Sequence, residues 1–250
     1  MPKIYPFCSS SKGNCTLYMG AEKVLLIDCG VPFLQITRAL ETQGKSWEDV
    51  GAVLLTHAHS DHIKAIPQIQ KHTRLPFYGS AETLAAAKIE GFAHEGKPFS
   101  LFGCTITPIT SCHDAAGSCG YRFDEGEASL ALVTDTGKIT PAMLQHLGGC
   151  SLIMLESNYD PDMLEYGPYP SSLKARVRGE RGHLSNGDCA ALLALNAMKG
   201  ELKTAVLAHL SDHNNTPLTA KAAIMDTFSQ YGIEDVQIEV AGPWCPALEV

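Results

Sequence analysis

The stretch "LLTHAHSDHIKAI", Leu54 to Ile66, places three histidines and one aspartate within six positions, directly after an apolar run. Imidazole and carboxylate groups together suit zinc, manganese or iron. His57 and His59 are two positions apart, so in an extended segment both rings point to the same side. Asp61 and His62 follow at once and can reach a second ion. The stretch therefore predicts metal ligands behind a buried strand; a solvated helix start rich in histidine is the alternative.

Composition and charge narrow the class of protein. The chain has 250 residues, of which 45% are hydrophobic and 18% charged, which argues for a globular protein and against disorder. The formal net charge is −8, so the chain as a whole does not attract nucleic acid. An anionic substrate would need local positive charge from metal ions or from a basic cluster.

The cysteines and the apolar runs indicate the compartment. The nine cysteines are an odd number and no two form a C-x-x-C, which disfavours a secreted disulfide framework and a zinc knuckle. The opening "MPKIYPFCSS" lacks the apolar core of a signal peptide, and no apolar run reaches the length of a membrane span. We expect a cytoplasmic protein with no membrane association.

Short apolar strands alternate with helical patterns along the chain. Helices are predicted over 81–91, ending at Gly91, over 185–200, capped by Ser185 or Asn186, and over 216–232, capped by Thr216. Buried strands are predicted over 23–28, 52–56, 75–79, 105–110, 120–124, 129–135, 151–157, 204–210 and 236–240. The pattern indicates an α/β or α+β protein whose sheets are covered by helices.

Polar residues of ligand type recur at the ends of these strands. They are Asp28, Thr56, His57, His113, Asp135, Glu156 and His209. Loops at the carboxyl edge of a sheet are common places for functional sites, although strands also end in ordinary polar turns. Because the first cluster alone cannot fill two ions, His113, Asp135 and His209 are the candidates that complete the site.

The motif "THAHSDH", residues 56–62, resembles the H-x-H-x-D-H signature of the metallo-β-lactamase superfamily. The phrase "VLLIDCG", residues 24–30, resembles the first motif of that family, and His113, Asp135 and His209 follow in the expected order. The resemblance covers nearly the whole chain. It implies an αββα four-layer sandwich, with residues 1–250 forming a single domain without an inserted cap domain.

The same resemblance implies a set of ligands for two divalent ions, zinc or manganese, with iron also possible. His57, His59 and His113 would hold one ion. Asp61, His62 and His209 would hold the other ion, Asp135 would bridge the two, and Asp28 would support the site.

Four phrases further resemble the YycJ/WalJ group of bacterial exonuclease-like proteins within the superfamily. They are "SSSKGNCTLY", "LESNYD", "GPYPSSLKARVRGERGHLSN" and "HLSDHNNTP", which begin at positions 9, 155, 167 and 209. Ser9 stands in a part of the first phrase where members of the group typically carry glycine. Glu156 and Asn158 in the second phrase are expected to support the site.

The third phrase supplies candidate substrate contacts. Lys174, Arg176, Arg178 and Arg181 are predicted to bind phosphates, with a solvated helix face as the alternative. His183 precedes a helix whose N-terminal amides can hold an anion, so we expect a phosphate contact or proton donor, unless it only shapes the capping loop. Ser185 and Asn186 beside it are further candidate phosphate contacts. Asp61 and His183 are the two residues assigned a catalytic role.

The leading hypothesis is a dinuclear metal-dependent phosphodiesterase, a 5′–3′ exonuclease acting on DNA ends through a metal-bound hydroxide. A small-molecule phosphodiester or thioester hydrolase on the same fold is the main alternative. A di-iron redox protein is disfavoured because His62 is present and no flavin domain fits. A binding module without catalysis is disfavoured because no ligand position is missing. The oligomeric state is not predicted.

Overall fold

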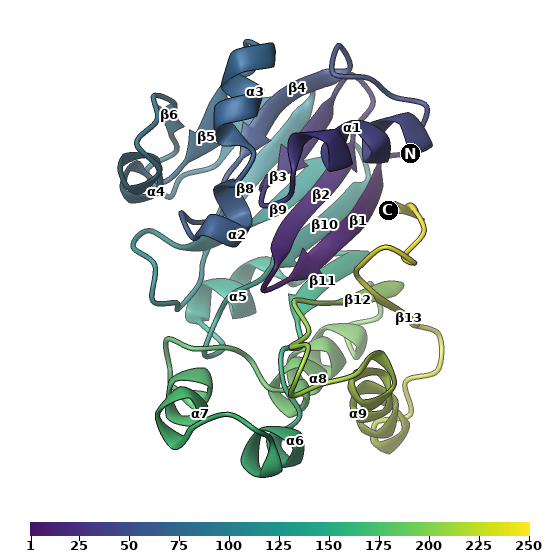
Figure 1. Ribbon diagram of the computed structural model, residues 1–250. Coiled ribbons are helices and arrows are strands. Elements are labelled where there is room, and N and C mark those ends of the chain that lie inside the picture. The colour runs from purple at the N-terminus through teal and green to yellow at the C-terminus, as the bar shows by residue number, and fades with distance from the viewer.

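The computed structural model describes residues 1–250 and contains two seven-stranded sheets, each with parallel and antiparallel strands (Figure 1). The first sheet has the order β14-β1-β2-β3-β4-β5-β6 and the second has the order β13-β12-β11-β10-β9-β8-β7. The strands of the first sheet are β1 (Lys3–Ser10), β2 (Gly13–Met19), β3 (Val24–Ile27), β4 (Val50–Leu54), β5 (Phe77–Gly79), β6 (Phe92–Ala93) and β14 (Leu248–Glu249). Those of the second are β7 (Phe99–Leu101), β8 (Cys104–Thr110), β9 (Cys119–Glu125), β10 (Ala128–Val133), β11 (Leu152–Glu156), β12 (Thr204–Ala208) and β13 (Gln237–Val240).

Helices cover the outer face of each sheet, which confirms the predicted αββα sandwich. The helices are α1 (Phe33–Thr42), α2 (Ser60–Ile63), α3 (Ile66–His72), α4 (Ala81–Ala87), α5 (Pro141–His146), α6 (Pro161–Tyr166), α7 (Ser171–Arg178), α8 (Asn186–Ala197) and α9 (Pro217–Gln230). The α1 and α3 helices pack on the first sheet and α8 and α9 pack on the second. No helix is long and apolar enough to cross a membrane.

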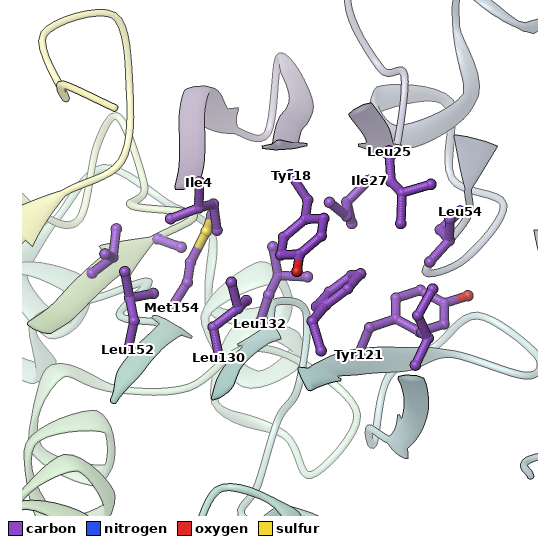
Figure 2. Close-up of a cluster of buried hydrophobic side chains, with 14 of the residues drawn as sticks. Ile4, Tyr18, Leu25, Ile27, Leu54, Tyr121, Leu130, Leu132, Leu152 and Met154 are labelled. Atoms are coloured by element: carbon purple, nitrogen blue, oxygen red, sulfur yellow. The ribbon is translucent and has the colours of Figure 1, made fainter. Parts of the chain in front are cut away.

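The central strands are mainly apolar on both faces, because both faces are buried. In β10, Leu130 and Leu132 point between the sheets, whereas Ala131 and Val133 pack against the helices. Figure 2 shows side chains from the two sheets meeting in this inter-sheet core, with Leu25 and Leu54 opposite Tyr121. Successive side chains of a strand point to opposite faces, and both faces are buried here, so these strands read as continuous apolar runs in the sequence.

The helix ends follow their capping residues, with one correction to the sequence prediction. Ser185 and Thr216 cap α8 and α9 through their side chains, as predicted. The α4 helix ends at Ala87 rather than at Gly91, because Lys88 adopts a left-handed conformation with a φ of 56°. Gly91 instead permits a close approach of two chain segments, since a Cβ there would lie 2.6 Å from the carbonyl oxygen of Phe77.

The strand ends gather the polar residues at one place. The β3 and β4 strands are parallel to each other, and so are β10, β11 and β12. Their carboxyl ends therefore deliver Asp28, His57, Asp135, Glu156 and His209 to neighbouring edges of the two sheets.

Candidate metal centre

Two groups of three ligand-type side chains lie next to each other at these sheet edges. His57, His59 and His113 form one group, and Asp61, His62 and His209 form the other. Within each group, one potential ligand atom per residue lies within 4.8 Å of the others. The structure thus brings together the sets that the sequence resemblance proposed for the two ions, although they come from distant parts of the chain.

Asp135 lies between the two groups. One carboxylate oxygen lies 3.3 Å from Nε2 of His62, and the other lies 3.7 Å from Nε2 of His113 and 3.4 Å from Nδ1 of His209. The carboxylate is almost fully buried. Burial opposes ionisation, but the adjacent His209 and His62 rings hold the pKa of Asp135 well below its usual value. Asp135 is therefore an ionised carboxylate that faces both groups.

Hydrogen bonds to one ring nitrogen orient the histidines. The Nδ1 atoms of His62 and His209 each lie 2.8 Å from a carboxylate oxygen, of Asp28 and Glu156 respectively. Nδ1 of His113 lies 3.0 Å from the carbonyl oxygen of Gly182. Because these partners accept hydrogen bonds, Nδ1 carries the proton and Nε2 keeps its lone pair. Histidines that bind metals are commonly fixed in this way.

Thr56 completes the same arrangement for His57. The Thr56 hydroxyl donates to Asp28 at 2.8 Å, so its single proton is used there. Its oxygen then accepts from Nδ1 of His57 at 3.0 Å, which again leaves Nε2 with a lone pair. Burial holds the pKa of His57 well below its ordinary value, which keeps the ring in the neutral form that metals require.

Among the candidate ligands, three buried polar atoms have no hydrogen-bond partner. They are Nε2 of His57, Nε2 of His209 and Oδ2 of Asp135. Leaving such atoms unpaired in a buried site is unfavourable by about 1–3 kcal/mol each. Cations between the two groups would satisfy these atoms, so the residues present fit divalent metal ions.

The backbone at the centre is also strained. Asp28, Asp135 and His209, each following a strand, have left-handed φ angles of 58°, 54° and 54°. Such conformations are unfavourable for residues other than glycine and cluster at functional sites. Gly30 permits the β3 loop to touch the metal-ligand loop, because a Cβ there would lie 1.5 Å from the carbonyl oxygen of Asp61.

Glu156 ties His183 to the centre. Its Oε1 accepts from Nδ1 of both His183 and His209 at 2.8 Å. Burial lowers the pKa of His183, but the Glu156 carboxylate outweighs that effect and raises it to about 9. His183 lines a cleft of about 170 Å³ beside the centre, together with His113 and Arg176.

The basic segment is less available for substrate than its sequence suggests. Arg178 and Lys174 both bond to Glu165 of α6, and Arg181 donates to the carbonyl oxygen of His113 at 3.2 Å. Arg176 alone of the four lines the cleft, where its guanidinium bonds to the Asp114 carboxylate at 2.6 Å and 3.1 Å. The sequence could not show this, because the acidic partners lie on other elements.

The remaining predicted contacts have structural roles. Ser185 caps α8 by accepting from the backbone of Asp188 at 3.1 Å. Asn186 is buried, and both polar atoms of its side chain are used: Oδ1 accepts from Ser157 and Asn215, and Nδ2 donates to Asn215. Asn158 donates to the carbonyl oxygen of His209 at 2.7 Å, in keeping with a supporting role.

Three residues at the centre lie outside the predicted set of site residues. Asn14 donates towards Nε2 of His62 at 3.0 Å, and the Ser9 hydroxyl accepts the backbone N–H of His209 at 2.9 Å. Asp114 lies 3.4 Å from His59 and 3.3 Å from His113. Its position directly after His113 was the available signal, and Ser9 and Asn14 lie in the opening serine-rich phrase.

Comparisons with known proteins agree with this geometry. Residues 23–210 match the family described as beta-lactamase superfamily domain. The chain is 34% identical to "Exodeoxyribonuclease YycJ" of Bacillus anthracis over 90% of this chain and 88% of the relative. It is 29% identical to "Exodeoxyribonuclease WalJ" of Streptococcus pneumoniae over 89% and 86%. The metallo-beta-lactamase fold protein YhfI of Bacillus subtilis superposes with a TM-score of 0.74 at 19% identity, covering 97% and 98% of the two chains.

Proposed function

The chain belongs to the beta-lactamase superfamily domain family and is a metal-dependent hydrolase, and from this premise we propose that it cleaves phosphodiester bonds at DNA ends. The observation that carries the metal-dependent part of the proposal is the set of unpartnered atoms of His57, Asp135 and His209, which lie in one buried cluster. The names of the two exodeoxyribonuclease relatives support DNA as the substrate, and we propose the 5′–3′ direction.

We propose that the centre holds two divalent ions, zinc or manganese, with iron as a further possibility. His57, His59 and His113 would hold one ion, Asp61, His62 and His209 the other, and Asp135 would contact both. When bound, such a pair supplies positive charge for the phosphoryl oxygens and an acidified water as nucleophile. The ions also make the centre of this acidic protein attractive to phosphate.

The chain's own residues would position the substrate and move a proton. Arg176 lines the cleft and is mostly exposed, so a substrate phosphate can exchange with Asp114 for its guanidinium. His183 is held by Glu156 through Nδ1, and its Nε2 is the atom available to donate a proton to the leaving oxygen. Asp61, partly exposed beside His62, completes the side of the centre opposite α7.

We further propose that residues 1–250 act as one domain without an inserted cap, so that the centre is reached from an open cleft. The nine cysteines are all free, which suits the cytoplasmic location expected from the sequence.

A small-molecule phosphodiester or thioester hydrolase is the alternative. One observation favours it: the cleft beside His183 has a volume of only about 170 Å³, below the range of about 300–1,000 Å³ typical of ligand sites. A small substrate would then need no contact beyond the centre and Arg176.

The test is one assay series on purified protein of measured metal content. It compares 5′-phosphorylated and unphosphorylated DNA and RNA with a generic small diester, and it includes Asp135→Ala as the control. We expect release of nucleotides from DNA ends by the parent and none by Asp135→Ala. Turnover of the small diester without action on DNA would support the alternative, and full activity in Asp135→Ala would refute the assignment.

A further inference from the structure

A second, larger groove reaches the metal centre from the side opposite α7. Its volume is about 510 Å³, and its wall is formed by the β1–β2 turn, α2, the start of α3 and the end of α4. Figure 1 shows α2 and α3 on the same side of the molecule, away from α6 and α7. None of the substrate contacts predicted from the sequence lines this groove. Asp61, a candidate metal ligand, does line it.

The groove is continuous with the centre. Asp61 lines it and also belongs to one of the two ligand groups. Ser11 at the β1–β2 turn lines both this groove and the small cleft beside His183. A chain-like substrate held at the centre can therefore extend into the groove. The volume lies within the range of about 300–1,000 Å³ for ligand sites, whereas that of the small cleft does not.

The groove has a cation without a partner in the protein. Lys64 is exposed on the groove wall and makes neither an ion pair nor a side-chain hydrogen bond. Lys12 at the rim pairs only with the exposed Asp212, at 2.7 Å. Exposed pairs of this kind are weak, so a phosphate can replace Asp212, as it can replace Asp114 on Arg176. Lys64 differs from Lys12 and from the cations of α7 because a phosphate need displace no acceptor from it.

The groove also offers apolar surface to a nucleoside. Pro67 and Ala87 provide that surface in the same groove that Lys64 lines. Apolar surface flanked by cations contacts sugar and base faces while the cations contact the backbone phosphates.

We propose that this groove binds the nucleotide next to the scissile bond, with Lys64 contacting a backbone phosphate and Pro67 and Ala87 contacting the nucleoside. The proposal rests on the proposed function, because it places a DNA strand at the metal centre. It assigns recognition of the polymer to the α2–α3 side rather than to the basic segment of α7.

The experiment measures binding of a fluorescent single-stranded phosphorothioate oligonucleotide to the metal-loaded protein over a range of salt concentrations. Lys64→Glu is compared with Lys71→Glu, which makes the same change of charge on α3 outside the groove. Ala87→Trp, which fills the groove, is compared with Ala85→Trp on the same helix. Metal content and thermal unfolding of each variant are measured alongside, so that misfolded protein is recognised.

We expect Lys64→Glu to weaken binding about ten-fold more than Lys71→Glu. It should also reduce the slope of log affinity against log salt by about 0.7, the value for one lost phosphate contact on a single strand. Ala87→Trp should weaken binding, and Ala85→Trp should not. Equal affinities and slopes within each pair would overturn the groove assignment. If the parent protein nevertheless degrades DNA ends, the proposed function stands; if it binds no oligonucleotide, both proposals fail.

Discussion

The inter-sheet core and the metal centre are built from the same strands but by opposite rules. Within β10, Leu130 and Leu132 are packed by apolar neighbours from both sheets, whereas Asp135, just beyond the strand, is buried with an unpartnered oxygen. The core lowers the free energy of the folded chain, and the centre raises it through desolvation and left-handed backbone. Substitutions in the core should therefore affect stability, and substitutions at the centre should affect function.

The largest expected effect is at the centre. Asp135→Asn keeps the shape of the side chain and tolerates the left-handed backbone, but it removes the charge that faces both ligand groups. Activity should fall about 10³-fold or more, because several kcal/mol of transition-state stabilisation by the ions would be lost. Measured by chemical denaturation, the metal-free variant should be at least as stable as the metal-free parent. A clear loss of stability would mean that the centre behaves like the core.

The second effect is at the core. Leu132→Ala should destabilise the protein by about 2–5 kcal/mol, because it leaves a cavity between the sheets. Leu132→Met, which nearly conserves volume, should lose less than about 1.5 kcal/mol. Both variants should bind as much metal per folded chain as the parent. A fall in metal content among folded molecules would show that the two regions are not separable.

The third effect tests the residue that orients two histidines. Glu156→Gln should reduce metal affinity about 10–100-fold, because the amide loses the negative charge beside His183 and His209, and its NH2 group cannot accept the backbone N–H groups of Thr136 and Leu184. His183→Ala should instead slow turnover far more than it lowers metal content. Calorimetric titration with zinc, together with the turnover rate, distinguishes the two variants. Equal losses of metal and turnover in His183→Ala would make His183 a ligand or a structural residue.

The smallest effect is a shift in thermal stability on adding metal. At a free metal concentration of about 100 times Kd, the folded state should gain about 2.7 kcal/mol from each bound ion. For a chain of this length, that gain corresponds to a rise in Tm of about 5–10 °C. The shift should disappear in Asp135→Asn; the same shift in that variant would place the stabilising ion elsewhere.

The sequence predicted the strands because they depend on local order, whereas His113, Asp135 and His209 were proposed as ligands only through the family resemblance. An apolar run is buried wherever it lies, and "THAHSDH" carries four candidate ligands in one turn. The free charge on the surface was not predictable, because it depends on pairing across elements: Asp114 pairs with Arg176, and Glu165 pairs with Arg178. The buried hydrogen bonds of Asn186 were not predictable for the same reason, since its partners Ser157 and Asn215 are distant in sequence. The end of α4 was missed because Lys88 adopts a left-handed conformation that its residue type does not favour.

We propose that two cations are enclosed by the side chains of His57, His59, Asp61, His62, His113, Asp135 and His209. Anomalous diffraction from crystals of the metal-loaded protein tests this directly. We predict two peaks, one among His57, His59 and His113 and one beside His62 and His209, with Asp135 within bonding distance of both. A single peak, or peaks away from Asp135, would contradict it.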